Sequence, residues 1–270
     1  MNRRPEGGLR IFWLGQAGFV VDIGGYRLVI DPYLSNTLAE KYAGTPRPHI
    51  RMMPPPILAE CVPFVDLVLC THAHTDHMDP GTLPPLLRAN PSAKLVVPRA
   101  TRQQAVDRSI TAEEHLVLAR AGEKLFPLPD LSIIPTRAAH ETLETDAEGN
   151  HRFLGYVIDA GSVRIWHSGD CVPFPGLESE VSAFMPDIAL LPVNGRRPEL
   201  SGHGVPGNFS LEEAIEIARG VGVTDVVAHH YGLFDFNTES PQTIDAAVAS
   251  VKDVHLHRAR TNVAFSWRGA

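Results

Sequence analysis

The sequence predicts an α/β fold in which a cluster of histidine and aspartate side chains lies where a strand ends. The first observation is an apolar, β-prone run at residues 65–70 that leads directly into Thr71-His72-Ala73-His74-Thr75-Asp76-His77. The second is a series of short apolar runs, separated by glycine turns at first and by helical segments further along. Ligands of α/β proteins bind at such strand ends, so the cluster marks the expected functional site.

Strands and helices can be assigned in order along most of the chain. Three short strands at 9–14, 19–23 and 26–30, joined by tight glycine turns, suit an antiparallel start to a sheet. Further strands are expected at 94–97, 122–126, 131–135, 153–159, 163–167, 187–193, 225–228, 254–256 and 262–265. Helices are expected at 83–88, 99–106, 241–251 and from Ser210, where Ser210-Leu211-Glu212-Glu213 reads as a capping box.

Composition is that of an ordinary globular protein. The 270 residues are 44% hydrophobic and 20% charged, and we predict a single domain over residues 1–270. The net charge of −7 and the lack of a long basic run argue against nucleic acid or anionic membrane as a partner, and they favour a small-molecule substrate. A homo-oligomer stays open.

The cysteines and the N-terminus favour a cytoplasmic protein. Cys61, Cys70 and Cys171 are odd in number and fit no zinc or redox spacing, so we predict buried, reduced thiols. Residues 1–10 are polar and lack the apolar core of a signal peptide. No stretch reaches the roughly 18 apolar residues of a membrane span.

The spacing within the cluster suits metal binding. His72 and His74 are two residues apart, so in an extended chain they point to the same side and can bind one metal. Asp76 and His77 follow at a turn and can be aimed at a second metal beside the first. Imidazole and carboxylate suit zinc, manganese or iron. The alternative is a polar surface turn, but four such groups within six residues favour the metal site.

This segment resembles the metal-binding motif of the metallo-β-lactamase superfamily. The resemblance implies an αββα sandwich, a four-layer α+β arrangement, with a hydrolytic site of one or two metals. Two further stretches resemble the superfamily branch that contains the L-ascorbate-6-phosphate lactonases: Trp13-Leu14-Gly15-Gln16-Ala17-Gly18-Phe19 and Ile30-Asp31-Pro32-Tyr33.

Later positions match the superfamily as well. His140 follows a strand end where the superfamily places a third histidine, and Ser168-Gly169-Asp170 resembles its bridging-aspartate signature. The pattern H-Y-x-x-F-x-F-N at 230–237 matches the lactonase branch and selects His230 over His229, since neighbouring strand residues point opposite ways. The resemblance implies two divalent ions, Mn²⁺ or Zn²⁺: one on His72, His74 and His140, the other on Asp76, His77 and His230, with Asp170 bridging.

The activity implied by the resemblance is hydrolysis of a lactone, expected to be a sugar or sugar-phosphate lactone, by a hydroxide shared between the metals. Asp76 and Asp170 are the expected catalytic residues, with Asp76 orienting the nucleophile and passing its proton on. The expected substrate contacts are Asn194, Arg196, Asn208 and Tyr231. One alternative is a phosphodiesterase that uses the same site. A non-catalytic metal-binding protein is a further alternative, but a structural zinc site needs only four ligands.

Three features have more than one interpretation. Asp31 is predicted to cap the turn before Pro32, with support of a metal-binding histidine as the alternative. The proline-rich segment 45–56 is predicted to be an ordered loop over the active site or at a subunit contact. Its Arg47, His49 and Arg51 either meet an anionic substrate or are solvated. His203 is extra relative to the lactonase branch, and its role is open.

Overall fold

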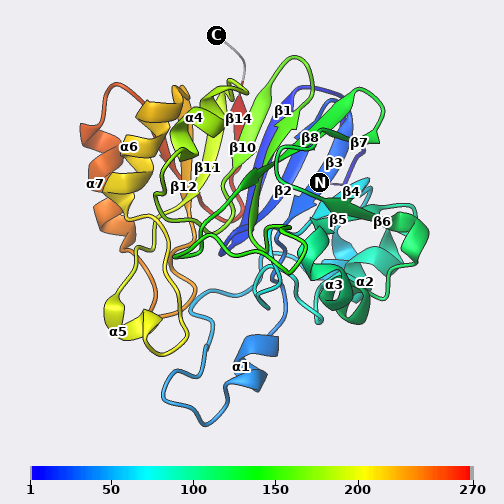
Figure 1. Cartoon of the computed structure of the whole chain (residues 1–270), viewed down its shortest axis with the longest axis horizontal. Coiled ribbons are helices and arrows are strands. Elements are labelled where there is room, and N and C mark those ends of the chain that lie inside the picture. Colours follow the sequence, from blue (N-terminus) through cyan, green and yellow to red (C-terminus); the bar gives the residue numbers. More distant parts are fainter. Residues whose placement is uncertain (1, 268–270) are drawn as a thin grey trace.

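The computed structural model describes residues 2–267 and contains two seven-stranded β-sheets packed against each other, with helices on the outer faces (Figure 1). The first sheet has the strand order β14-β1-β2-β3-β4-β5-β6, and the second has the order β13-β12-β11-β10-β9-β8-β7. In each sheet one part is antiparallel and the other is parallel. This is the αββα sandwich that the resemblance implied.

The strands of the first sheet are β1 (Leu9–Gly15), β2 (Gly18–Ile23), β3 (Tyr26–Ile30), β4 (Leu67–Leu69), β5 (Lys94–Pro98), β6 (Leu116–Ala119) and β14 (Ala264–Trp267). Those of the second are β7 (Leu125–Leu128), β8 (Leu131–Arg137), β9 (Leu154–Asp159), β10 (Arg164–His167), β11 (Ile188–Pro192), β12 (Asp225–His229) and β13 (His255–Arg258).

The α-helices are α1 (Thr37–Lys41), α2 (Leu83–Ala89), α3 (Arg102–Ser109), α4 (Leu177–Ser182), α5 (Pro198–Ser201), α6 (Leu211–Val221) and α7 (Pro241–Ser250). Short 3₁₀ turns cover Ala59–Cys61, Arg99–Thr101 and Glu113–His115. Helices α2 and α3 pack beside the first sheet, and α4, α6 and α7 pack beside the second. The Ser210 side chain and Glu213 form the expected capping box at the start of α6.

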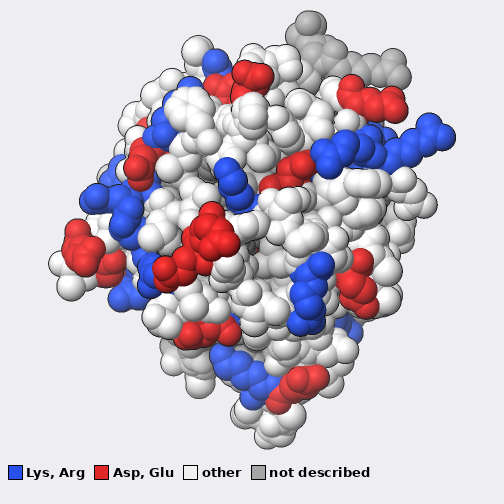
Figure 2. All heavy atoms as spheres, turned by 90° about the vertical axis from the view of Figure 1, so that its right-hand side faces the viewer, with Lys and Arg blue, Asp and Glu red and all other residues white. Residues whose placement is uncertain are grey.

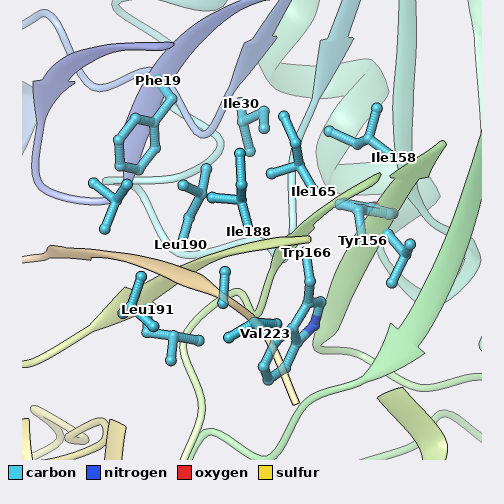
Figure 3. Close-up of a cluster of buried hydrophobic side chains, with 14 of the residues drawn as sticks. Phe19, Ile30, Tyr156, Ile158, Ile165, Trp166, Ile188, Leu190, Leu191 and Val223 are labelled. Carbon is cyan, nitrogen blue, oxygen red and sulfur yellow. The ribbon is translucent and has the colours of Figure 1, made fainter. Parts of the chain in front are cut away.

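The main core lies between the two sheets. Figure 3 shows Phe19 and Ile30 of the first sheet facing Ile188 and Leu190 of the second, and all four side chains are fully buried. On the other face of the second sheet, Trp166 and Leu191 point away from the first sheet. Side chains alternate along each strand, so β10 and β11 bury one face against a sheet and the other against helices. Both faces are apolar for this reason.

The predicted strands and helices are largely present, and the differences are local. Strand β6 and helices α1, α4 and α5 were not predicted, because each is short and lacks a clear period. Cys70 and Cys171 are buried free thiols, but Cys61 is exposed, which corrects the prediction that all three are buried. None of the helices within residues 2–267 has the length and apolar character needed to span a membrane.

On the face shown in Figure 2, lysine and arginine side chains are interspersed with aspartate and glutamate. Neither sign forms a continuous patch there. At one end of the sandwich, by contrast, α1 and α5 protrude beyond the sheets (Figure 1). The loops that follow β4, β8, β10 and β12 carry the chemically reactive side chains.

Candidate active site

Four loops, each following a strand, bring the predicted metal ligands together. The first follows β4 and carries His72, His74, Asp76 and His77, and the others follow β8, β10 and β12 and carry His140, Asp170 and His230. Strand β4 belongs to the first sheet and β8, β10 and β12 to the second, so residues far apart in sequence meet where the two packed sheets end.

The donors form three overlapping groups, in each of which the ligand atoms lie within 4.8 Å of one another. The groups are His72, His74 and His140; His72, His77 and Asp170; and Asp76, His77 and His230. Asp170 Oδ2 lies 3.3 Å from Nε2 of His77, 3.3 Å from Nε2 of His230 and 3.6 Å from Nε2 of His140. One carboxylate therefore touches both of the predicted ligand sets.

The backbone at His230 explains why this histidine, and not His229, reaches the cluster. Strand β12 ends at His229, and His230 has φ 61°, in the left-handed region that non-glycine residues seldom adopt. The turn directs His230 toward Asp170. The His229 ring instead packs edge-on against Phe19 at 5.0 Å and near His167 at 5.1 Å, fully buried between the sheets.

The electrostatics of the cluster suit a cation. Burial lowers the pKa of His72 well below its ordinary value and lowers the pKa of His140 to about 4, so both rings are neutral near pH 7. Burial also disfavours the carboxylate form of Asp170, but the charges of His230 and His77 outweigh it and hold its pKa well below the ordinary value. Neutral imidazoles beside an ionised carboxylate are the forms that bind metals.

Asp31 supports His77 from behind. Its Oδ2 lies 2.8 Å from Nδ1 of His77 and accepts from the Thr71 hydroxyl at 2.6 Å, while Oδ1 accepts from the Thr71 backbone N–H at 2.7 Å. The contact places the proton on Nδ1 and leaves Nε2 of His77 facing Asp170. The prediction that Asp31 merely caps a turn is therefore wrong. The local sequence around Asp31 does not indicate this role, because its partner Thr71 is 40 residues away in sequence.

We expect Asp31→Asn to weaken the affinity for a metal ion held by His77 about 10–100-fold, since the amide cannot hold His77 in the same tautomer and orientation. Titration of metal-free protein with zinc against a competing chelator measures the affinity. Asp22→Asn is a matched control, because Asp22 is as deeply buried but pairs with Arg27. Equal zinc affinities of wild type and Asp31→Asn would contradict the supporting role.

A cavity of about 700 Å³ opens over the cluster, and Asp76, His74, His140, Asp170 and His230 lie among its lining residues. Thr45, Pro46, Arg47 and His49 line it too, which places the proline-rich segment over the site as one of the two predicted locations. His203 also lines this cavity. Arg51 does not: its guanidinium donates to the carbonyls of Tyr33, Ser35 and Met53 and holds the loop.

The predicted substrate contacts lie outside this cavity. The guanidinium of Arg196 pairs with both carboxylate oxygens of Glu213, each at 2.6 Å, and anchors its turn to the start of α6. Tyr231 is buried against Trp13 with ring centroids 5.0 Å apart, and its hydroxyl donates to the Ala259 carbonyl. Both residues therefore have structural partners, and the prediction of direct contact with substrate is corrected for them.

Asn194 and Asn208 are also buried away from the cavity, but hydrogen bonds connect them to a residue that lines it. Asn208 Nδ2 donates to Asn194 Oδ1 at 3.0 Å, and Asn194 Nδ2 donates to Asn237 Oδ1 at 3.0 Å. Asn237 lines the cavity. The prediction of direct contact is thus corrected for Asn194 and Asn208, whose role is to hold Asn237.

We expect Arg196→Lys to leave kcat/KM for any substrate within about twofold, because the side chain meets Glu213 and not the cavity. The pair is partly exposed, so the free energy of unfolding should fall by no more than about 1 kcal/mol. Steady-state kinetics and a denaturant titration check both values. A rise in KM of tenfold or more would restore Arg196 as a substrate contact.

Two further residues shape the cluster and were not predicted. Gln16, with φ 51°, donates from Nε2 to Asp76 Oδ2 at 2.9 Å. Arg108 donates from Nη1 to the carbonyls of Ala73 and Met78 and so fixes the histidine loop. Gln16 lies within a matched motif, but its partner is 60 residues away, and no local pattern marks Arg108.

Comparison with known proteins identifies related chains. The family model Lactamase_B_2, described as beta-lactamase superfamily domain, matches residues 26–231. N-acyl-phosphatidylethanolamine-hydrolyzing phospholipase D 1 of Caenorhabditis elegans is 24% identical over 245 residues, which cover 86% of this chain and 66% of that protein. A UPF0173 metal-dependent hydrolase of Rubrobacter xylanophilus is 27% identical over 254 residues, covering 91% of this chain and 90% of the relative.

Solved structures show the same fold. A possible metal-dependent hydrolase from Veillonella parvula superposes with a TM-score of 0.76 at 15% identity, covering 97% of this chain and 100% of the other. Igni18, a metallo hydrolase from Ignicoccus hospitalis, gives a TM-score of 0.67 at 21% identity, covering 96% of this chain and 99% of the other.

Proposed function

The chain belongs to the metallo-β-lactamase superfamily, and from that premise we propose that it is a metal-dependent hydrolase of ester bonds in small molecules. The observation that carries the proposal is the convergence, in three groups, of seven histidine and aspartate side chains, five of which line an open cavity. A closed structural site would use four ligands and no cavity.

The residues fit metal ions. Among the described residues, Nε2 of His72, His77 and His230 and Oδ1 of Asp170 are buried and have no hydrogen-bond partner. A buried polar atom without a partner costs about 1–3 kcal/mol, so several that converge on one point indicate a cation. Imidazole and carboxylate donors suit Zn²⁺ and Mn²⁺.

We assign the residues to two positions. His72, His74 and His140 would hold one ion, Asp76, His77 and His230 would hold the other, and Asp170 would be shared. Such ions lower the pKa of coordinated water and stabilise negative charge that develops on the reacting group. His77 would have to release a proton to bind an ion, because its pKa is raised: burial opposes the charge, but Asp170, Asp31 and Asp76 outweigh it.

Asp76 is the residue placed to handle a proton. Its side chain is 17% exposed, it lines the cavity, and Gln16 holds its Oδ2. Burial raises the pKa of Asp76, but the charge of His77 outweighs it and keeps the carboxylate ionised. Asp76 can orient the attacking water, accept its proton and deliver that proton to the leaving oxygen.

Two ester classes are candidates for the bond that is cleaved. A sugar or sugar-phosphate lactone is the first, supported by the likeness of residues 13–19 and 230–237 to the lactonase branch. A phosphodiester is the second, supported by the relative from C. elegans, whose name is that of a phospholipase D. Two-metal sites suit attack on a carbonyl and displacement at phosphorus alike.

A parallel assay separates the two classes. Protein loaded with zinc or with manganese is tested on a panel of sugar lactones and on bis(p-nitrophenyl) phosphate, with Asp170→Asn as the control for contaminating enzymes. We expect turnover of one class that depends on Asp170. Protein that carries its metals, yet shows no Asp170-dependent turnover of either class, would contradict the proposal and favour a non-catalytic metal-binding protein.

A further inference from the structure

One wall of the cavity is built from contiguous polar and aromatic side chains. We call it the outer wall, and it consists of Lys41, Tyr42, Arg47, His49, Phe236 and Asn237, all of which line the cavity. The His49 ring stacks on Tyr42 with centroids 4.3 Å apart and meets Phe236 edge-on at 4.8 Å. Lys41 Nζ lies 5.1 Å from the centre of the Tyr42 ring. The segment 41–49 and the loop after β12 therefore form one surface.

The charges of the outer wall have no acidic partner. Within residues 2–267, neither Lys41 nor Arg47 has a carboxylate within 4.0 Å, and the only acidic residues that line the cavity are Asp76 and Asp170 of the metal cluster. The guanidinium of Arg47 makes a single long hydrogen bond, 3.4 Å from Nη2 to the Glu199 carbonyl oxygen. In a chain of net charge −7, two cations without a counter-charge beside one cavity form a site for an anion.

Asn237 lines the cavity and is held by a hydrogen bond to its side-chain oxygen. Its Oδ1 accepts from Asn194 Nδ2, and Asn194 Oδ1 in turn accepts from Asn208 Nδ2. Within residues 2–267 the Nδ2 group of Asn237 has no hydrogen-bond partner. Asn237 thus has an amide donor without a protein partner on the wall that carries Lys41 and Arg47.

From these observations we propose that the outer wall binds an anionic group of the substrate, remote from the bond that is cleaved. The inference rests on the proposed hydrolase function and narrows its substrates to esters that carry an additional phosphate or carboxylate. Arg47 can pair with either anion in a bidentate manner, Asn237 donates to an oxygen of the same group, and the rings of Tyr42, His49 and Phe236 contact its carbon skeleton.

Steady-state kinetics on a matched set of lactones tests whether the outer wall binds an anionic group. The set holds one sugar lactone in three forms: neutral, with a phosphate and with a carboxylate. We expect Arg47→Gln to raise KM about tenfold for the charged forms, while kcat and the KM for the neutral form stay within about twofold. Asn237→Asp keeps the shape and the bond from Asn194 but places negative charge on the wall, so it should act in the same direction.

Arg196→Gln is the control, because that arginine is paired with Glu213 outside the cavity and should change none of these constants. An effect confined to the phosphorylated form identifies phosphate as the group bound, and an effect on both charged forms identifies an anion in general. Equal effects of Arg47→Gln on charged and neutral forms, or none at all, would overturn the inference. If phosphodiesters are the substrates, a pair with and without a terminal carboxylate replaces the lactones.

Direct binding separates failure of the inference from failure of the proposed function. Calorimetric titration of the metal-loaded chain with sulfate, a stand-in for a phosphate monoester, should show affinity at least about fivefold weaker in Arg47→Gln than in wild type and Arg196→Gln. Equal sulfate affinities in all three proteins would overturn the inference whatever the protein hydrolyses. A loss in Arg47→Gln without turnover of any ester would support the anion site and refute the hydrolase function.

Discussion

Asp170→Asn is expected to empty both halves of the candidate metal centre and to lower hydrolysis at least about 10²–10³-fold. The Asp170 carboxylate lies within 3.6 Å of Nε2 of His77, His230 and His140, so it contacts both ligand sets. An amide has no negative charge and only one acceptor oxygen for two metals. Elemental analysis after saturation with zinc and removal of free ions should fall from about two equivalents per chain to below one.

Asp225→Asn is the matched control for this variant. Asp225 begins β12, the strand that ends next to His230, and it also pairs with a histidine, His257 at 2.9 Å. It lies at the opposite end of the strand from the cluster, so its loss should leave zinc content and activity unchanged. An Asp170→Asn protein that keeps both zinc equivalents would show that Asp170 is not shared between the ions.

Alanine substitutions of the two adjacent histidines at the end of β12 should have opposite effects: one should remove metal, and the other should lower stability. We expect His230→Ala to lose the second metal and about 10² or more in kcat/KM, with a smaller loss of stability than His229→Ala, because the His230 ring lines the open cavity and water can fill its space. His229→Ala should keep both metals. Its ring packs against Phe19 and His167 with no exposure, so its removal leaves a cavity that costs about 2–4 kcal/mol of unfolding free energy.

Zinc content, steady-state kinetics and denaturant unfolding of the two proteins separate these effects. Loss of metal in His229→Ala with full metal in His230→Ala would place the end of β12 one residue out of register. Unfolding should be measured on metal-free protein, since a bound ion adds its own stabilisation to the folded state.

Much of the fold could be predicted because its strands carry clear local signals. The glycine turns between β1, β2 and β3 and the apolar run of β11 each indicate their structure within a few residues. Strand β6 lies at the sheet edge with three of its four residues only half-buried, and α4 is six residues long, so neither had a pattern strong enough to detect. The same limit applies to α5, which is four residues long.

The cluster of histidine and aspartate side chains could be predicted from the sequence, whereas the substrate contacts could not. His72, His74, Asp76 and His77 lie within six residues, and His140, Asp170 and His230 each follow a strand, so motif and topology agree. Arg196 also follows a strand, but Glu213 competes for its guanidinium, and that pairing depends on the tertiary position of α6. The same is true of Asp31, whose role arises from contacts with Thr71 and His77.

Anomalous diffraction from crystals of zinc-saturated protein tests the central claim most directly, because it locates each ion independently of any assay. The seven donors should hold two ions per chain. We expect one anomalous peak coordinated by His72, His74 and His140 and a second coordinated by Asp76, His77 and His230, with Asp170 touching both. A single peak, or peaks that these residues do not coordinate, would contradict the two-ion centre on which the proposed hydrolase function depends.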